Sequence, residues 1–217
     1  MEPVKRRYHS PKRERQAQQT REQIIEAARR LFASDGFAKT TVEAIAREAG
    51  VSAQTVYASV GSKHGIVLAL LDRMEVGGGN EELRRELESS KNPRQQLRAI
   101  VRFNRQLFER GQDVLKIVTA TRADPEVEAF SQEGEARRRE GQARWVRAWA
   151  EAGVLRPNLD EGEAADVLWA LTGPELYWLF VVNCGWPGSR FEEWTFDTLE
   201  AQLFGTATSD AHLVRLT

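Results

Sequence analysis

Apolar residues recur every three to four positions along most of this chain, a spacing that predicts amphipathic helices. Sustained alternation of apolar and polar residues, the mark of strands, is absent, and we find no internal repeat. The fold class is therefore all-α. The expected helices span residues 20–35, 40–49, 52–60, 62–74, 93–110, 114–123, 126–152, 164–182 with a break at 172–174, and 189–203.

Helix starts are indicated by three pairs of residues with the spacing of a capping box, in which a hydroxyl caps the helix and an acid or amide three residues later reaches back. The pairs are Thr20 with Gln23, Thr40 with Glu43, and Ser189 with Glu192. Gly36 and Gly50 stand where the first two helices should end, because glycine readily takes the left-handed conformation of a helix terminus.

The most informative stretch is residues 40–64, which predict a helix, a four-residue turn and a short second helix. Ser52 can cap the second helix, and its first exposed side chains are then Ala53, Gln54 and Thr55. A helix-turn-helix presents these early positions to the major groove of DNA. The pattern therefore favours DNA recognition over a helical corner in a core.

The run from Phe37 to Tyr57, followed by Ser62 and Lys63, resembles the N-terminal domain of the tetracycline-repressor (TetR) family. The resemblance covers about residues 20–75. It implies a three-helix DNA-binding domain followed by a larger helical domain for ligand binding and dimerisation. We expect Gln54 and Thr55 to face base edges, with Ala53 beside them. Phosphate contacts are expected from Thr41, Ser52, Tyr57 and Lys63.

Charge is distributed unevenly along the chain, although the net charge is only −1. Residues 1–65 hold 12 Lys and Arg against 7 Asp and Glu, whereas the remainder holds 19 against 25. A basic end on an acidic body suits a phosphate-binding domain joined to a partner domain that does not bind DNA.

The domain boundaries follow from these patterns. We expect a disordered basic arm over residues 1–19, which either follows DNA or serves only as a solubilising tail. The DNA-binding domain then spans 20–65, with a linking helix to about residue 76. A ligand-binding and dimerisation domain spans 77–205, and a flexible tail covers 206–217.

The last part of the chain is strongly apolar and resembles the dimer-forming helix pair of TetR-like regulators. Two ordinary core helices would give the same pattern. The residues expected between subunits are Leu168, Leu176, Val181, Phe191, Trp194 and Leu199. Aromatic residues that could line an apolar ligand cavity are Phe103, Phe108, Trp145, Trp149, Trp169, Tyr177 and Trp178.

Catalytic and metal-binding patterns are absent from the sequence, which has only three histidines and one cysteine. We therefore expect no enzyme activity, no cofactor and no metal site. No apolar run is long enough to cross a membrane. The single Cys184 fits a reducing cytoplasm.

Two functions remain open. The first is a homodimeric transcriptional regulator, in the simplest form a repressor, that binds an operator in double-stranded DNA and is released by an unknown apolar or amphipathic effector. By resemblance, the effector would displace the linking helix over 62–74, taken as the only continuous link between the domains. The alternative is a helical DNA-binding architectural or interaction protein without small-molecule control.

Overall fold

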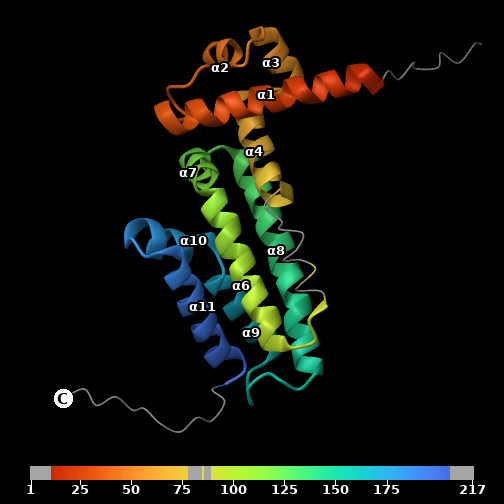
Figure 1. Cartoon of the computed structure of the whole chain (residues 1–217), viewed down its shortest axis with the longest axis vertical. Helices are drawn as coiled ribbons and strands as arrows, with labels where there is room; N and C mark the ends of the chain where they lie inside the picture. The colour runs from red at the N-terminus through yellow and green to blue at the C-terminus, as the bar shows by residue number, and fades with distance from the viewer. Residues whose placement is uncertain (1–10, 78–84, 86–88, 206–217) are drawn as a thin grey trace, which may run out of the picture. The chain divides into compact units, whose positions relative to one another are not determined.

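The computed structural model describes residues 11–77, 85 and 89–205, and every regular element in these ranges is a helix (Figure 1). The all-α prediction is therefore confirmed. The helices are α1 (Pro11–Asp35), α2 (Val42–Glu48), α3 (Ala53–Val60), α4 (Lys63–Gly77), α6 (Pro93–Arg110), α7 (Gln112–Thr121), α8 (Pro125–Glu151), α9 (Glu161–Leu171), α10 (Pro174–Tyr177), the π-helical turn η1 (Trp178–Asn183) and α11 (Gly188–Leu203).

The chain divides into two compact units that are not continuous in sequence. The first unit joins Met1–Met74 to Asp113–Phe130, and the second joins Glu75–Gln112 to Ser131–Thr217. The chain thus passes between the units three times, within α4, before Asp113 and within α8. The expectation that the linking helix is the only continuous connection is wrong.

The first unit is built around a core to which α1, α2, α3, α4, α7 and the start of α8 contribute. Ile24, Ile45, Ile66 and Val67 are fully buried in it. Val114, Ile117 and Val118 of α7 and Val127 of α8 belong to the same core. The DNA-binding domain expected over residues 20–65 therefore packs against α7 and the start of α8, and no local sequence pattern predicts this packing.

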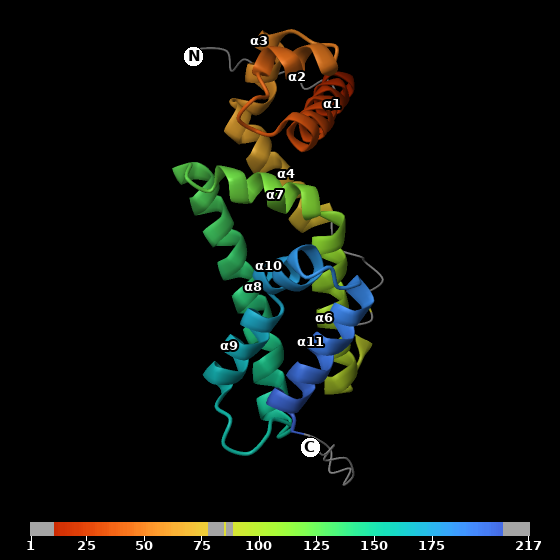
Figure 2. The same cartoon turned by 90° about the vertical axis from the view of Figure 1, so that its left-hand side faces the viewer.

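The second unit packs α6, the remainder of α8, α9 and α11 around another core (Figure 2). Leu97, Trp149, Leu168 and Leu199 are buried at its centre. A bound ligand is not needed to explain this packing, because apolar faces at helical spacing bury one another.

Helix ends confirm some of the expected signals. Gly36 and Gly50 take positive φ values of 82° and 68° at the ends of α1 and α2. Pro93 lies in the first turn of α6, whose N-cap Asn92 accepts hydrogen bonds from two backbone N–H groups. Pro125 begins α8, and the Asp124 carboxylate accepts from the backbone N–H groups of Glu126 and Val127.

The three capping boxes, in contrast, do not form as expected. Thr41 rather than Thr40 is the N-cap of α2, with its hydroxyl accepting from the Ala44 N–H at 3.1 Å. Thr40 is buried and donates to the Gly36 carbonyl at 2.9 Å. At α11 the N-cap is Pro187 and no side chain caps the helix, so Ser189 is inside it.

Helix α1 begins at Pro11, so the expectation of disorder over 1–19 is wrong for residues 11–19. Thr20 lies inside the helix and donates to the Gln16 carbonyl at 2.9 Å. The residues between are mainly Arg, Gln and Ala, which have high helix propensity. They extend an existing helix without an apolar stripe, because only nucleation is costly. Residues 1–10 of the expected arm, residues 78–84 and 86–88 near the start of the expected second domain, and the tail over 206–217 lie outside the described ranges.

Candidate DNA-binding interface

The helix-turn-helix is held together by its apolar face and by two capped helix starts. Val42, Ile45 and Ala46 bury one side of α2, and Val56 and Val60 bury one side of α3. The Ser52 hydroxyl accepts from the Thr55 N–H at 3.1 Å, which fixes the first turn of α3. The first two turns of α3 are therefore both rigid at the backbone and free of the core on their other side.

Five of the seven residues expected at DNA come together on those turns. Ser52, Gln54 and Tyr57 are exposed, with Tyr57 at 52% the most exposed large apolar side chain among the described residues, while Ala53 and Thr55 are half-buried. The Ser52 and Thr55 hydroxyl oxygens lie 2.8 Å apart. The Gln54 amide can both donate and accept hydrogen bonds, as recognition of a base edge requires.

Thr41 is exposed at the start of α2, where its hydroxyl oxygen is already used in capping. A hydroxyl has one donor proton as well as acceptor lone pairs, so the cap leaves the proton available. A helix N-terminus also favours nearby negative charge. The location therefore suits a DNA phosphate.

Lys63 departs from its expected role as a phosphate contact. Its ammonium donates to the carbonyls of Phe37 at 2.8 Å and Thr40 at 3.0 Å, and lies 4.1 Å from the Phe37 ring centre. Burial lowers its pKa. Because these contacts use two of its three donors inside the protein, Lys63 ties the loop before α2 to the start of α4.

We therefore expect Lys63→Met to destabilise the protein by roughly 1–3 kcal/mol, the range for hydrogen bonds to a charged group. The salt dependence of DNA binding should stay unchanged. Urea unfolding and a salt titration of duplex binding measure the two effects, with exposed Lys39→Met as the control. If the slope of log affinity against log salt fell by about one while stability stayed unchanged, Lys63 would be assigned to a phosphate contact after all.

The start of α4 is packed tightly against the end of α3. A Cβ built on Gly65 would lie 2.1 Å from the Val60 carbonyl oxygen, which is far inside contact distance. The neighbouring His64 places Nδ1 3.3 Å from an Asp124 carboxylate oxygen and its ring centre 5.0 Å from that of Phe37. Only glycine fits at position 65 while these contacts are kept.

Gly65→Ala is accordingly expected to destabilise the first unit, because the backbone of α3 or α4 must move. Strain of this kind typically costs about 1–3 kcal/mol. Gly141→Ala in α8 is the control, since its Cβ would meet only the end of Arg144 at 3.8 Å and alanine favours helix. Thermal unfolding of both variants checks the prediction, which fails if Gly65→Ala is as stable as Gly141→Ala.

Two arginines of α1 hold the interface in place and were missed in the sequence. Arg21 donates to the Ser59 carbonyl at 2.5 Å, near the end of α3. Arg29 forms a two-pronged ion pair with Asp113 of α7, at 2.6 and 2.8 Å. This hydrogen-bonded pair lowers the pKa of Asp113 and raises that of Arg29. Sequence offers no signal for it, because the partners are 84 residues apart.

The Arg29–Asp113 pair should make stability depend on pH in the acidic range. Because the folded state lowers the pKa of Asp113, its contribution is present above the ordinary carboxyl pKa of about 4 and is lost as pH falls through the folded value. Asp113→Asn should cost roughly 1 kcal/mol at pH 7, since both side chains are 34% exposed and solvent screens the pair.

Urea unfolding at pH 7 and pH 3 checks this, and the difference between Asp113→Asn and the parent protein should shrink at pH 3. Asp166→Asn is the control, because its ion pair with Arg139 leaves the side chains 60% and 55% exposed. An equal deficit of Asp113→Asn at both pH values would contradict the assignment.

In the second unit, the aromatic residues expected around a ligand divide into two groups. Trp149 and Tyr177 are 1% and 2% exposed and belong to packed surroundings. The Trp149 indole donates to Gln96 at 2.7 Å, and Tyr177 packs against Phe108 and Phe191. Trp149, Tyr177 and Phe108 therefore serve the core. The remaining four, which are half-buried, are Phe103, Trp145, Trp169 and Trp178.

The residues expected between subunits also divide. Leu168, Phe191 and Leu199 are 0%, 3% and 0% exposed within one chain, so they cannot contact a partner in this conformation. These assignments are wrong because apolar spacing does not tell a protomer core from an interface. Leu176, Val181 and Trp194 remain half-buried.

Trp194 belongs to an aromatic patch that it forms with Phe180 and Trp186. The ring centre of Phe180 lies 4.6 Å from that of Trp186 and 4.7 Å from that of Trp194, and all three residues are partly exposed. Leu179, next to the patch in sequence, is 47% exposed. The patch and Leu179 give the second unit a partly uncovered apolar surface.

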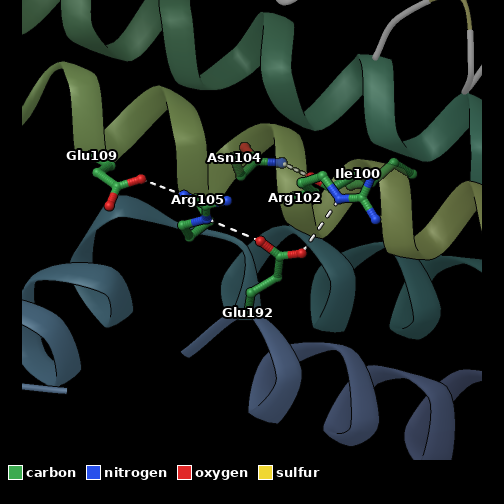
Figure 3. A network of polar contacts seen from close by, with 6 residues as sticks. All are labelled: Ile100, Arg102, Asn104, Arg105, Glu109 and Glu192. Carbon is green, nitrogen blue, oxygen red and sulfur yellow. Dashed lines mark hydrogen bonds and ion pairs between the residues drawn. The ribbon is translucent and has the colours of Figure 1, made fainter. Parts of the chain in front are cut away.

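Helix α11 is fixed to α6 by a network of charges, drawn in Figure 3. The Glu192 carboxylate receives Nε–H groups of Arg102 at 3.4 Å and of Arg105 at 2.9 Å. Arg105 also pairs with Glu109 one turn along α6. Glu192, expected in a capping box with Ser189, is used for this tertiary contact instead.

The described ranges contain no cluster of side chains able to hold a metal ion. Nor does any described helix have the length and apolar character required to cross a membrane.

Comparisons with known proteins bear on the helix-turn-helix first. Residues 24–70 match the family model described as "Bacterial regulatory proteins, tetR family". The HTH-type transcriptional regulator TtgR of Pseudomonas putida is 48% identical over 59 residues, which are 27% of this chain and 28% of TtgR. The chain thus matches less than a third of that relative's length.

Longer matches are weaker in sequence. The HTH-type transcriptional repressor NicS, also of Pseudomonas putida, is 26% identical over 152 residues, covering 70% of this chain and 67% of NicS. The solved SmeT–triclosan complex has a TM-score of 0.70 at 22% identity, over 91% of this chain and 98% of that one. This likeness shows the fold.

Proposed function

This chain belongs to the tetR family of bacterial regulatory proteins, and we propose that it is a sequence-specific transcriptional regulator that binds operator DNA through α3. The observation that carries the proposal is the exposed face of α3. Gln54 and Tyr57 stand clear of the core on a helix whose start is fixed by Ser52. Gln54 and Thr55 would read base edges, and Ser52, Tyr57 and Thr41 would contact phosphates.

Dimerisation forms part of the proposal. The aromatic patch, Leu176, Val181 and Leu179 offer an apolar surface that a second copy would cover about a two-fold axis. Two reading helices would then meet operator half-sites related by the same symmetry. The similarity to proteins named as regulators supports this arrangement.

We propose that the protein is a repressor released by a small apolar or amphipathic effector bound in the second unit. The name of NicS supports repression, and the triclosan complex of SmeT supports a small-molecule effector. Displacement of α4 need not carry the signal alone. Since α7 and the start of α8 belong to the first unit, movement of α6 or the rest of α8 can also reach it.

Selection from a random duplex library, followed by footprinting on the recovered sequence, tests the proposed function. We expect an inverted repeat, protected by the full-length protein. Recovery of no common sequence, with binding that depends only on salt, would favour an architectural DNA-binding protein without small-molecule control. The packed positions of Trp149 and Tyr177 leave that second function open.

A further inference from the structure

Four side chains of the second unit converge at the contact between α8 and the end of α9. Arg138 and Gln142 lie one turn apart on α8, while Trp169 and Thr172 lie at the end of α9. Thr172 is 2% exposed, and its hydroxyl oxygen receives Gln142 Nε2 at 2.9 Å and Arg138 Nη1 at 3.4 Å. We name these residues the Arg138 cluster.

The cluster contains a largely desolvated positive charge. Burial lowers the pKa of Arg138, with only partial compensation from Glu175 and Glu135. In the part of the chain that the structure describes, Arg138 donates only to neutral acceptors, the Thr172 hydroxyl and the Trp169 carbonyl at 3.0 Å. A guanidinium presents five N–H donors, so these two contacts leave most of its capacity unused.

Two further polar atoms of the cluster are buried without a hydrogen-bond partner among the described residues. They are Oε1 of Gln142, a residue that is 6% exposed, and Nε1 of Trp169. Leaving a buried donor or acceptor unpaired costs free energy that an apolar residue of similar shape would not. Native proteins contain few such groups, so two of them beside a buried charge require a physical reason.

Rotation of the Gln142 amide would leave the cluster with three available hydrogen-bond donors, on Gln142, Trp169 and Arg138. The Thr172 hydroxyl now donates to the Leu168 carbonyl at 2.7 Å, and it could donate to Gln142 Oε1 instead. Gln142 Nε2 would then be free to donate, alongside Trp169 Nε1–H and the guanidinium. Three donors, one of them charged, match the oxygens of a carboxylate.

We propose that the Arg138 cluster binds the carboxylate of an organic acid, with the apolar body of the acid against the neighbouring apolar side chains of the second unit. The inference rests on the proposed effector control and narrows its ligand class to amphipathic anions. Arg138 supplies the charge, and Gln142 and Trp169 orient the carboxylate.

A purely structural role for Arg138 makes a different prediction. Its contact with the Trp169 carbonyl places positive charge at the C-terminal end of α9, where a cation stabilises a helix. In that case Arg138→Met should lower the melting temperature. As a ligand anchor, Arg138 is a largely desolvated charge that Glu175 and Glu135 compensate only in part, and Arg138→Met should leave the melting temperature unchanged or raise it.

The test uses the full-length protein with octanoate and benzoate as probes, and octanamide and benzamide as neutral analogues. Binding is followed through the Trp169 indole resonance in ¹H–¹⁵N spectra, assigned with Trp169→Phe. We expect at least one acid to shift this resonance and to bind about tenfold or more tightly than its amide, as a charge-assisted hydrogen bond implies.

The variants are Arg138→Met and Gln142→Glu, which supplies an internal carboxylate one turn from Arg138. Both should lose about tenfold or more in affinity for the acid. Arg139→Met is the matched control, because Arg138 and Arg139 lie over the Trp169 ring at 5.3 and 5.5 Å from its centre, but Arg139 is exposed and paired with Asp166. It should retain affinity within about threefold.

Failure of both acids to shift the Trp169 resonance, equal binding of acid and amide, or unchanged affinity of Arg138→Met would each overturn the proposal. A lower melting temperature with unchanged affinity would assign Arg138 to the end of α9. Operator binding of each variant is measured without probe, so loss of anion binding is distinguished from failure of the proposed DNA-binding function.

Discussion

Replacing Leu179 by Asp is expected to separate the subunits and to lower operator affinity by about 10²–10⁴-fold, the usual gain from linking two binding modules. Leu179 is 47% exposed in one chain, so the substitution should leave the protomer folded. In a dimer formed through this surface it would bury an unpaired carboxylate. Sedimentation and binding to the selected operator measure the two effects.

Ala136→Asp is the matched control, since it adds the same carboxylate at an exposed position of α8. It should remain dimeric and keep its operator affinity. A parent protein that sediments as a folded monomer at micromolar concentration would remove the basis of this prediction. A dimer that tolerates Leu179→Asp would place the interface elsewhere.

Substituting Gln54 by Ala should cost about 1–3 kcal/mol of operator binding, the discrimination expected from a good amide–base pair. The physical reason is that the side chain is exposed on α3 and has no hydrogen-bond partner among the described residues that would fix it within the fold. The loss should be confined to one base position in each half-site. Binding to non-operator DNA and its salt dependence should be unchanged, because Gln54 carries no charge.

Gln23→Ala provides the control, since it removes an exposed amide from α1 without altering α3. Affinities of both variants are compared on the operator and on duplexes changed one base pair at a time. A uniform loss over all sequences would reassign Gln54 to the DNA backbone. An unaltered profile would exclude it from base recognition.

The sequence by itself determined the fold class and the helix face that we propose to read DNA. Helical spacing of apolar residues, the glycines at positions 36 and 50, and Ser52 before α3 are local signals, and each acts within about one helical turn. Local signals were less accurate about helix starts. Two neighbouring hydroxyls could cap α2, and the structure uses Thr41 where Thr40 was expected. Residues of high helix propensity extend α1 toward the N-terminus, so that it begins at Pro11.

Tertiary structure alone decided which apolar residues are buried in a protomer core and which charged residues form contacts within the fold. Leu168 and Leu199 fill the interior of one protomer, although their spacing equally suits an interface. Lys63 donates hydrogen bonds to two backbone carbonyls of the first unit, and Asp113 forms an ion pair with an arginine 84 residues away. Burial and ion pairing depend on which distant segments meet, and no pattern within a single helix records its partner.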